Sequence, residues 1–199
     1  MYIDCPSCHQ TTLIPYSHEE FSVRCKHCHT AISSVNEKLK THNFLTEIKP
    51  LIPLKMEQTG SLLGRTYKIM ASSVYQGMHE DTEWTWSEWL LMDNNQELKW
   101  LSFSMEEGFL LFDFIESYPL NFKSIQKIPT PEGELPIIDH ITAKLKNFEG
   151  YLPWSTHDFH TYTYYSSIIN KTYYSLEVFH NEASLFKGVP INPLEVESG

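Results

Sequence analysis

The four cysteines of this chain are the residues whose spacing most directly predicts chemistry. They form two Cys-x-x-Cys pairs, Cys5 with Cys8 and Cys25 with Cys28, and sixteen residues separate the pairs. This spacing is typical of four-thiolate zinc sites, in which each pair turns sharply so that both sulfurs face one ion. Two disulfides or an iron centre are the alternatives, and we disfavour disulfides because Met1–Pro6 has no apolar segment of a secretion signal. We predict one Zn²⁺ bound by the four thiolates.

The predicted zinc site is closed, since four ligands complete a tetrahedron and leave no position for water or substrate. We therefore expect the metal to support the fold and not to act as a Lewis acid. His9, His27 and His29 lie next to the cysteines, and we expect them to remain outside the coordination sphere. The intervening "TTLIPYSHEEFSVR" is typical of strand, turn and strand, so Tyr2–Ser34 is similar to a zinc ribbon.

Aromatic residues and one carboxylate form the second group of candidate site residues. In an extended strand, Glu88 shares a face with Trp84 and Trp86, and Tyr162 and Tyr164 share a face of a later strand. We predict a ligand or partner surface formed by Trp84, Trp86, Glu88, Tyr162 and Tyr164.

Glu88 is open to two interpretations if it is buried. It could be paired with Arg65 or Lys68, which is the interpretation we favour, or it could have a raised pKa suited to acid–base chemistry. The second interpretation gives an alternative function, a hydrolase or transferase that uses Glu88 with a histidine in a cleft.

Three histidines are candidates for that acid–base pair: His140, His157 and His160. His157 and His160 lie in the sequence "HDFH", which also admits a metal site with Asp158. The two histidines are three residues apart on an expected loop, and not four apart on a helix as in the metalloprotease signature. We interpret "HDFH" as a solvated loop.

The elements that position these residues are predicted to be strands. "RTYKIMASSVY", "WTWSEWLLM", "ELKWLSF" and "FLLFDFI" form one set, and "IIDHITAKLKNF", "FHTYTYYSSI", "TYYSLEVF" and "ASLFKGV" form a second. We predict a mainly β fold, in which a small zinc ribbon (1–35) precedes two four-strand antiparallel meanders (61–199) packed as a sandwich or closed as a barrel. Residues 36–60 are expected to be a linker, with a short helix over Glu37–Ile48 that ends at Pro50.

Several of these segments resemble a bacterial family known as domain of unknown function 4178. The resemblance lies in "LLGRTYKI", "WSEWLLM", "LKWLSF", "EEGFLLF" and "TYYSLEVFHNEASLFKGVPI", and it covers about residues 62–196. It implies a cytosolic β-rich module, often behind a zinc ribbon and encoded near membrane-stress, polyamine and peptide-ligation genes. It implies no particular activity.

The distribution of charge limits the partners we expect. Eight basic and six acidic residues occur through Lys68, whereas seven basic and nineteen acidic residues follow it. The larger region should therefore repel nucleic acid. We also expect no membrane span, because no apolar run approaches about 20 residues. These features predict a cytoplasmic, non-enzymatic adaptor or binding protein with a protein partner or a small ligand.

Overall fold

The part of the chain that the structure describes consists of strands, turns and irregular segments. The computed structural model describes residues 1–15, 19–43, 48–79, 82–119, 125–157, 161–179, 182–192 and 197–198. No helix occurs in these ranges, so none of them contains a helix that could cross a membrane. The predicted mainly β fold is confirmed.

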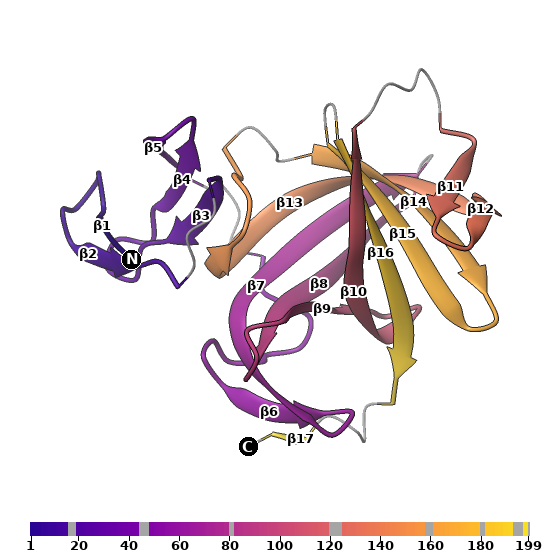
Figure 1. Ribbon diagram of the computed structural model, residues 1–199. Helices are drawn as coiled ribbons and strands as arrows, with labels where there is room; N and C mark the ends of the chain where they lie inside the picture. Colours follow the sequence, from indigo (N-terminus) through magenta and orange to yellow (C-terminus); the bar gives the residue numbers. More distant parts are fainter. Residues whose placement is uncertain are drawn as a thin grey trace.

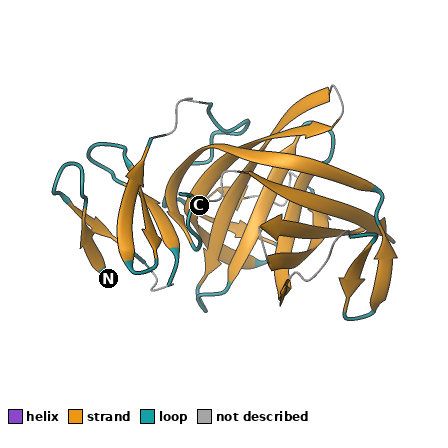
Figure 2. Cartoon of the chain, turned by 90° about the horizontal axis from the view of Figure 1, so that it is seen from above, coloured by secondary structure: helices purple, strands orange, loops and turns teal. Residues whose placement is uncertain are grey.

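Eight antiparallel strands close into a barrel (Figures 1 and 2). In order around the barrel they are β7 (Arg65–His79), β8 (Thr82–Asp93), β9 (Leu98–Ser104), β10 (Gly108–Pro119), β16 (Glu182–Ile191), β15 (Thr172–Phe179), β14 (Thr161–Ile169) and β13 (Asp139–Leu152). Pairing of β13 with β7 closes the ring. The two predicted meanders, β7–β10 and β13–β16, are therefore confirmed, and the barrel is their mode of closure.

Three of the barrel strands contain a register shift that helps them to curve. The shifts lie between Ile69 and Ala71 in β7, between Phe114 and Glu116 in β10, and between Leu145 and Asn147 in β13. A bulge bends its strand and increases the local twist, which a closed sheet requires.

Five short strands precede the barrel and form the N-terminal module seen beside it in Figure 1. They are β1 (Tyr2–Asp4), β2 (Thr11–Leu13), β3 (Phe21–Arg24), β4 (Ala31–Val35) and β5 (Lys38–His42). β1 pairs with β2, and β4 lies between β3 and β5 in a separate antiparallel set.

The predicted helix over Glu37–Ile48 is wrong, because Lys38–His42 forms β5. Asn36 and Glu37 adopt left-handed φ angles of 49° and 62°, and Val35 pairs with Lys38. A two-residue turn with both central residues left-handed returns the chain antiparallel to β4. The N-terminal module thus extends into the segment that we assigned to a linker.

Strand β3 joins the N-terminal module to the barrel. Ser22 and Val23 pair with Leu152 and Tyr151 at the end of β13. The Tyr151 side chain packs in the apolar cluster of the N-terminal module, where its ring stacks on Phe21 at a centroid distance of 6.2 Å. Strands β3, β4 and β5 of the module therefore continue the sheet of the barrel.

The remaining segments cover the outside of the barrel. Ile52, Leu54 and Met56 pack on an outer apolar cluster that includes Trp89 and Leu91. β6 (Thr59–Leu62) continues the sheet beyond β7 and pairs with β17 (Glu197–Ser198). The hairpin of β11 (Lys127–Thr130) and β12 (Gly133–Pro136) supplies Ile128 and Leu135 to a second outer cluster. Because these segments bury the outer face of the barrel, strands such as β8 are apolar on both faces.

Candidate functional site

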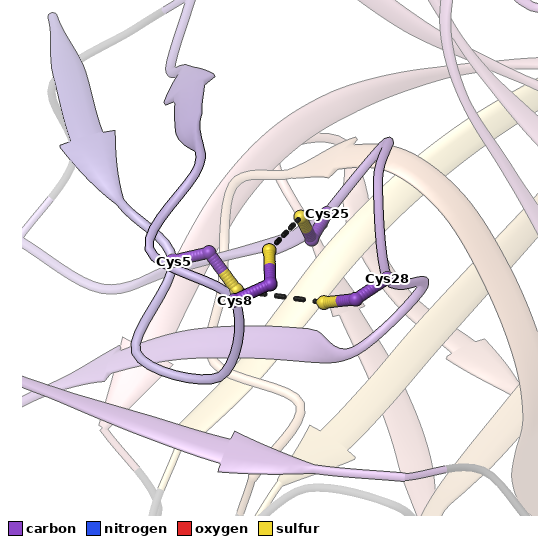
Figure 3. A group of neighbouring side chains, drawn as sticks. All are labelled: Cys5, Cys8, Cys25 and Cys28. Atoms are coloured by element: carbon purple, nitrogen blue, oxygen red, sulfur yellow. Dashed lines mark hydrogen bonds between the residues drawn. The ribbon is translucent and has the colours of Figure 1, made fainter.

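The four cysteines converge within the N-terminal module, where their side chains point toward one another (Figure 3). Their sulfur atoms all lie within 4.8 Å of one another, and the Cys5–Cys28 and Cys8–Cys25 sulfur distances are 3.6 Å and 3.7 Å. Four sulfurs placed tetrahedrally about 2.3 Å from one ion are about 3.8 Å apart. All four thiols are free of disulfides. The geometry therefore fits a single four-coordinate metal ion.

The two Cys-x-x-Cys segments have the same backbone structure. In each, the amide four residues after the first cysteine donates to the carbonyl of that cysteine: His9 to Cys5 at 2.8 Å and His29 to Cys25 at 2.9 Å. Both histidines have left-handed φ angles, 60° and 59°. This turn aims the two sulfurs of each pair in one direction, as the spacing predicts.

The surroundings of the cysteines favour a closed metal site. Cys5 and Cys25 are fully buried, while Cys8 and Cys28 are half-buried. Hydrogen bonding to Thr30 lowers the pKa of the Cys28 thiol to about 6. Against a backbone hydrogen bond of Gln10, burial and the other three cysteines raise the pKa of the Cys8 thiol to about 12. A shared proton load of this kind is relieved when a cation binds all four sulfurs. The side chains of His9, His27 and His29 are exposed and are not part of the ligand cluster.

A second candidate site is a cavity of about 1200 Å³ inside the barrel. Every one of the eight barrel strands contributes residues to its lining. Aromatic side chains dominate the wall: Tyr75, Trp84, Trp86, Trp100, Phe112, Phe114, Trp154, Tyr162, Tyr164, Tyr173, Tyr174, Phe179 and Phe186. Concave sites with aromatic walls are the usual form of a small-molecule pocket, and acidic and serine side chains share this wall with the rings.

Two glycines leave room for the rings on this wall. A Cβ atom at Gly188 would lie 2.4 Å from Cε1 of Phe112. A Cβ atom at Gly77 would lie 2.8 Å from Cγ2 of Ile141 and 2.9 Å from Cζ3 of Trp86. Both distances are too short for carbon atoms in contact, so a larger residue would displace the rings.

The five residues predicted as a ligand or partner surface all lie on the cavity wall. They are Trp84, Trp86, Glu88, Tyr162 and Tyr164. The Trp86 and Tyr164 rings meet edge to face at 5.8 Å, which joins the two halves of the barrel. That these residues bind a ligand remains a prediction.

Glu88 has a different partner from the one we predicted. Arg65 lies 3.1 Å from Glu97 and 3.7 Å from Asp93, so it does not pair with Glu88. The Trp86 Nε1–H donates to Glu88 Oε1 at 2.8 Å. Burial raises the pKa of Glu88 to about 7, although the hydrogen bond from Trp86 opposes this shift.

A second glutamate, Glu177, shares the cavity with Glu88, and our sequence interpretation did not identify it. Its pKa is raised well above the ordinary value, first by burial and then by the charge of Glu88. The sequence signal for Glu177 is weak, because a lone Glu in the apolar strand "TYYSLEVF" does not show which face points inward.

The histidines do not join Glu88. Among the described residues, none of those that line the cavity is a histidine. The ring of His140 stacks on Tyr165, and the ring of His157 meets His42 edge to face near the N-terminal module. Asp158 and His160, the rest of the "HDFH" sequence, lie outside the described residues. The acid–base pair of the alternative function is therefore not assembled in the described part of the chain.

The barrel and the cysteine cluster define a β-barrel protein with an N-terminal module whose four cysteines lie close enough to hold a metal ion. Comparison with known proteins finds no family model, no curated protein and no solved structure that matches this chain.

Proposed function

We propose that this chain is a non-enzymatic binding protein, in which the barrel holds a small organic ligand and the N-terminal module is a zinc ribbon. The cavity of about 1200 Å³ carries this proposal. It is large enough for a ligand of drug size, since such pockets usually measure about 300–1,000 Å³. Glu88 supports binding over acid–base catalysis, because no histidine lines the cavity in the part of the chain that the structure describes.

Tryptophan fluorescence offers a direct test of the ligand-binding function. Trp84, Trp86, Trp100 and Trp154 line the cavity, whereas Trp89 is buried on the outer face. Saturable quenching or a spectral shift, together with a higher melting temperature, is expected when a ligand enters. A panel of small molecules that leaves both signals unchanged would contradict a ligand-binding barrel.

Zinc is the metal that we propose for the cysteine cluster. The tetrahedral spacing of the sulfurs and the four-thiolate donor set support it, because soft thiolates bind zinc tightly in structural sites. Native mass spectrometry with elemental analysis should find one zinc per chain. Purification with bound iron, or with no metal under reducing conditions, would contradict the assignment.

The N-terminal module also carries the proposal of a protein partner. Tyr2 and Leu13 are directly paired across β1 and β2, and their side chains are 71% and 55% exposed. Exposed apolar side chains that adjoin one another form the contiguous patches by which proteins contact partners. The resemblance to domain of unknown function 4178 supports a role in the bacterial cytosol, in a membrane-stress or polyamine-linked system. Affinity purification with a Tyr2→Ser and Leu13→Ser double variant as the control would test the partner.

A further inference from the structure

The acidic and basic residues around the cavity are strongly unequal. Of the described residues, nine acidic ones and one basic one line it. The one basic residue, Lys99, forms an ion pair with Asp113 and is therefore neutralised. A cavity of this composition repels anions and attracts cations, and low-dielectric walls strengthen the effect.

Two of these carboxylates lie deep inside the barrel without a positive partner. Among the described residues, Glu88 accepts a hydrogen bond from Trp86 but has no ion pair, and Glu177 has no side-chain hydrogen bond or ion pair. Each keeps part of its surface open to the cavity. Buried carboxylates are normally paired or hydrogen-bonded, so both lack a counter-charge that a ligand could supply.

Aromatic rings lie between the two carboxylates. Glu177 is directly paired with Tyr164 across β14 and β15, so both side chains lie on the same face of the sheet. The Tyr164 ring contacts Trp86, whose indole N–H binds Glu88. Aromatic faces attract cations at up to about 6 Å from the ring centre, and Trp and Tyr are the strongest such residues.

A metal ion fits this arrangement less well than an organic cation. The four cysteines form the only convergent group of three or more metal-binding side chains in the described residues. In the described part of the chain, Glu88 and Glu177 therefore have no third His, Cys, Asp or Glu converging with them, whereas Ca²⁺ takes six to eight oxygen ligands. The rings around them favour a cation that also carries an apolar body.

We propose that the barrel cavity selects organic ammonium cations, with the charged nitrogen near Glu88 and Glu177 and the apolar part of the ligand against the aromatic wall. This inference rests on the proposed ligand-binding function. The ammonium group supplies the missing counter-charge, and the Trp86 and Tyr164 rings contact its polarised C–H or N–H groups. Neutral molecules of the same shape gain only the apolar contacts.

Three ligands of equal length and different charge test the proposal: octylammonium, octan-1-ol and octanoate. We expect octylammonium to bind one per chain and at least tenfold more tightly than octan-1-ol, with octanoate weakest, in titrations followed by tryptophan fluorescence and calorimetry. The variant Glu177→Gln should reduce the preference for octylammonium over octan-1-ol to less than threefold. Glu149→Gln is the matched control, because Glu149 is exposed and does not line the cavity.

The outcomes separate this inference from the proposed function. Equal binding of octylammonium and octan-1-ol in the cavity overturns cation selection but leaves a ligand-binding barrel. Binding of none of the three overturns both. Octylammonium binding that exceeds one per chain and is unchanged in Glu177→Gln identifies surface adsorption and also overturns the proposal. Circular dichroism melting checks that Glu177→Gln is folded.

Discussion

The substitution Glu88→Gln should stabilise the protein above neutral pH. The amide has nearly the same shape as the carboxylate, and its oxygen can still accept the hydrogen bond from Trp86 Nε1. The substitution therefore removes the negative charge of Glu88 and keeps this hydrogen bond. Burial raises the pKa of Glu88 from 4.5 to about 7. At about 1.4 kcal/mol per pKa unit, the ionised carboxylate lowers the free energy of unfolding by about 3 kcal/mol at pH 8.

The sign of the pH dependence follows from proton binding. Between about pH 4.5 and pH 7 the folded protein holds a proton on Glu88 that the unfolded chain has lost, so stability falls as pH rises through this window. Tyr75, Tyr162 and Tyr164 surround the same space, and burial raises their pKa values further above 10, so they stay neutral. Glu177 faces Glu88 and resists ionisation when Glu88 is charged.

Urea denaturation at several pH values measures this effect. Wild type and Glu88→Gln should have similar free energies of unfolding at pH 4.5, and the variant should be more stable by about 3 kcal/mol at pH 8. Glu149→Gln, at an exposed position, should follow wild type throughout. Equal stability of Glu88→Gln and wild type at pH 8, or a variant that is less stable there, would refute the assignment of Glu88 as a buried, unpaired carboxylate.

Three further predictions concern the metal site, the cavity wall and the ligand. Cys25→Ser should abolish one-to-one zinc binding. Because β3 pairs with β13, the same variant should also lower the melting temperature of the barrel. An unchanged barrel transition would show that the N-terminal module and the barrel fold independently. Gly188→Ala should lower the free energy of unfolding by about 1–3 kcal/mol because its methyl group meets the Phe112 ring, and Phe112→Leu in the same chain should restore part of the loss in urea denaturation. The affinity for octylammonium should increase from pH 6 to pH 8, because protonation of Glu88 and Glu177 competes with the cation; a flat calorimetric profile would contradict this linkage.

The cysteine cluster and the two meanders could be predicted from sequence because their signals are local. Spacing alone restricts Cys5, Cys8, Cys25 and Cys28 to a shared site, and period-2 alternation places Trp84, Trp86 and Glu88 on one face of a strand. Neither inference depends on which strands are neighbours in space.

The rest depends on contacts between distant segments. Closure of β7 on β13 decides which strand faces point inward, and it brings Glu177 near Glu88 although 88 residues separate them in the sequence. The hairpin at Asn36 and Glu37 was mistaken for a helix start because the left-handed conformation of Glu37 has no sequence signature. The partners of Arg65, which are Glu97 at 3.1 Å and Asp93 at 3.7 Å, lie in the turn after β8 and at the end of β8, and they depend on the pairing of β7 with β8.

The instability predicted for the empty barrel and its predicted preference for cations have the same physical origin. A fold selected only for stability would place neutral or apolar residues at positions 88 and 177, because an unpaired buried carboxylate lowers the free energy of unfolding. A cation that pairs with Glu88 and Glu177 removes this penalty and therefore binds more tightly than its contacts with the aromatic wall alone would allow. The two glutamine substitutions should consequently shift both properties together, raising the stability of the free protein while reducing the stabilisation that an ammonium ligand provides.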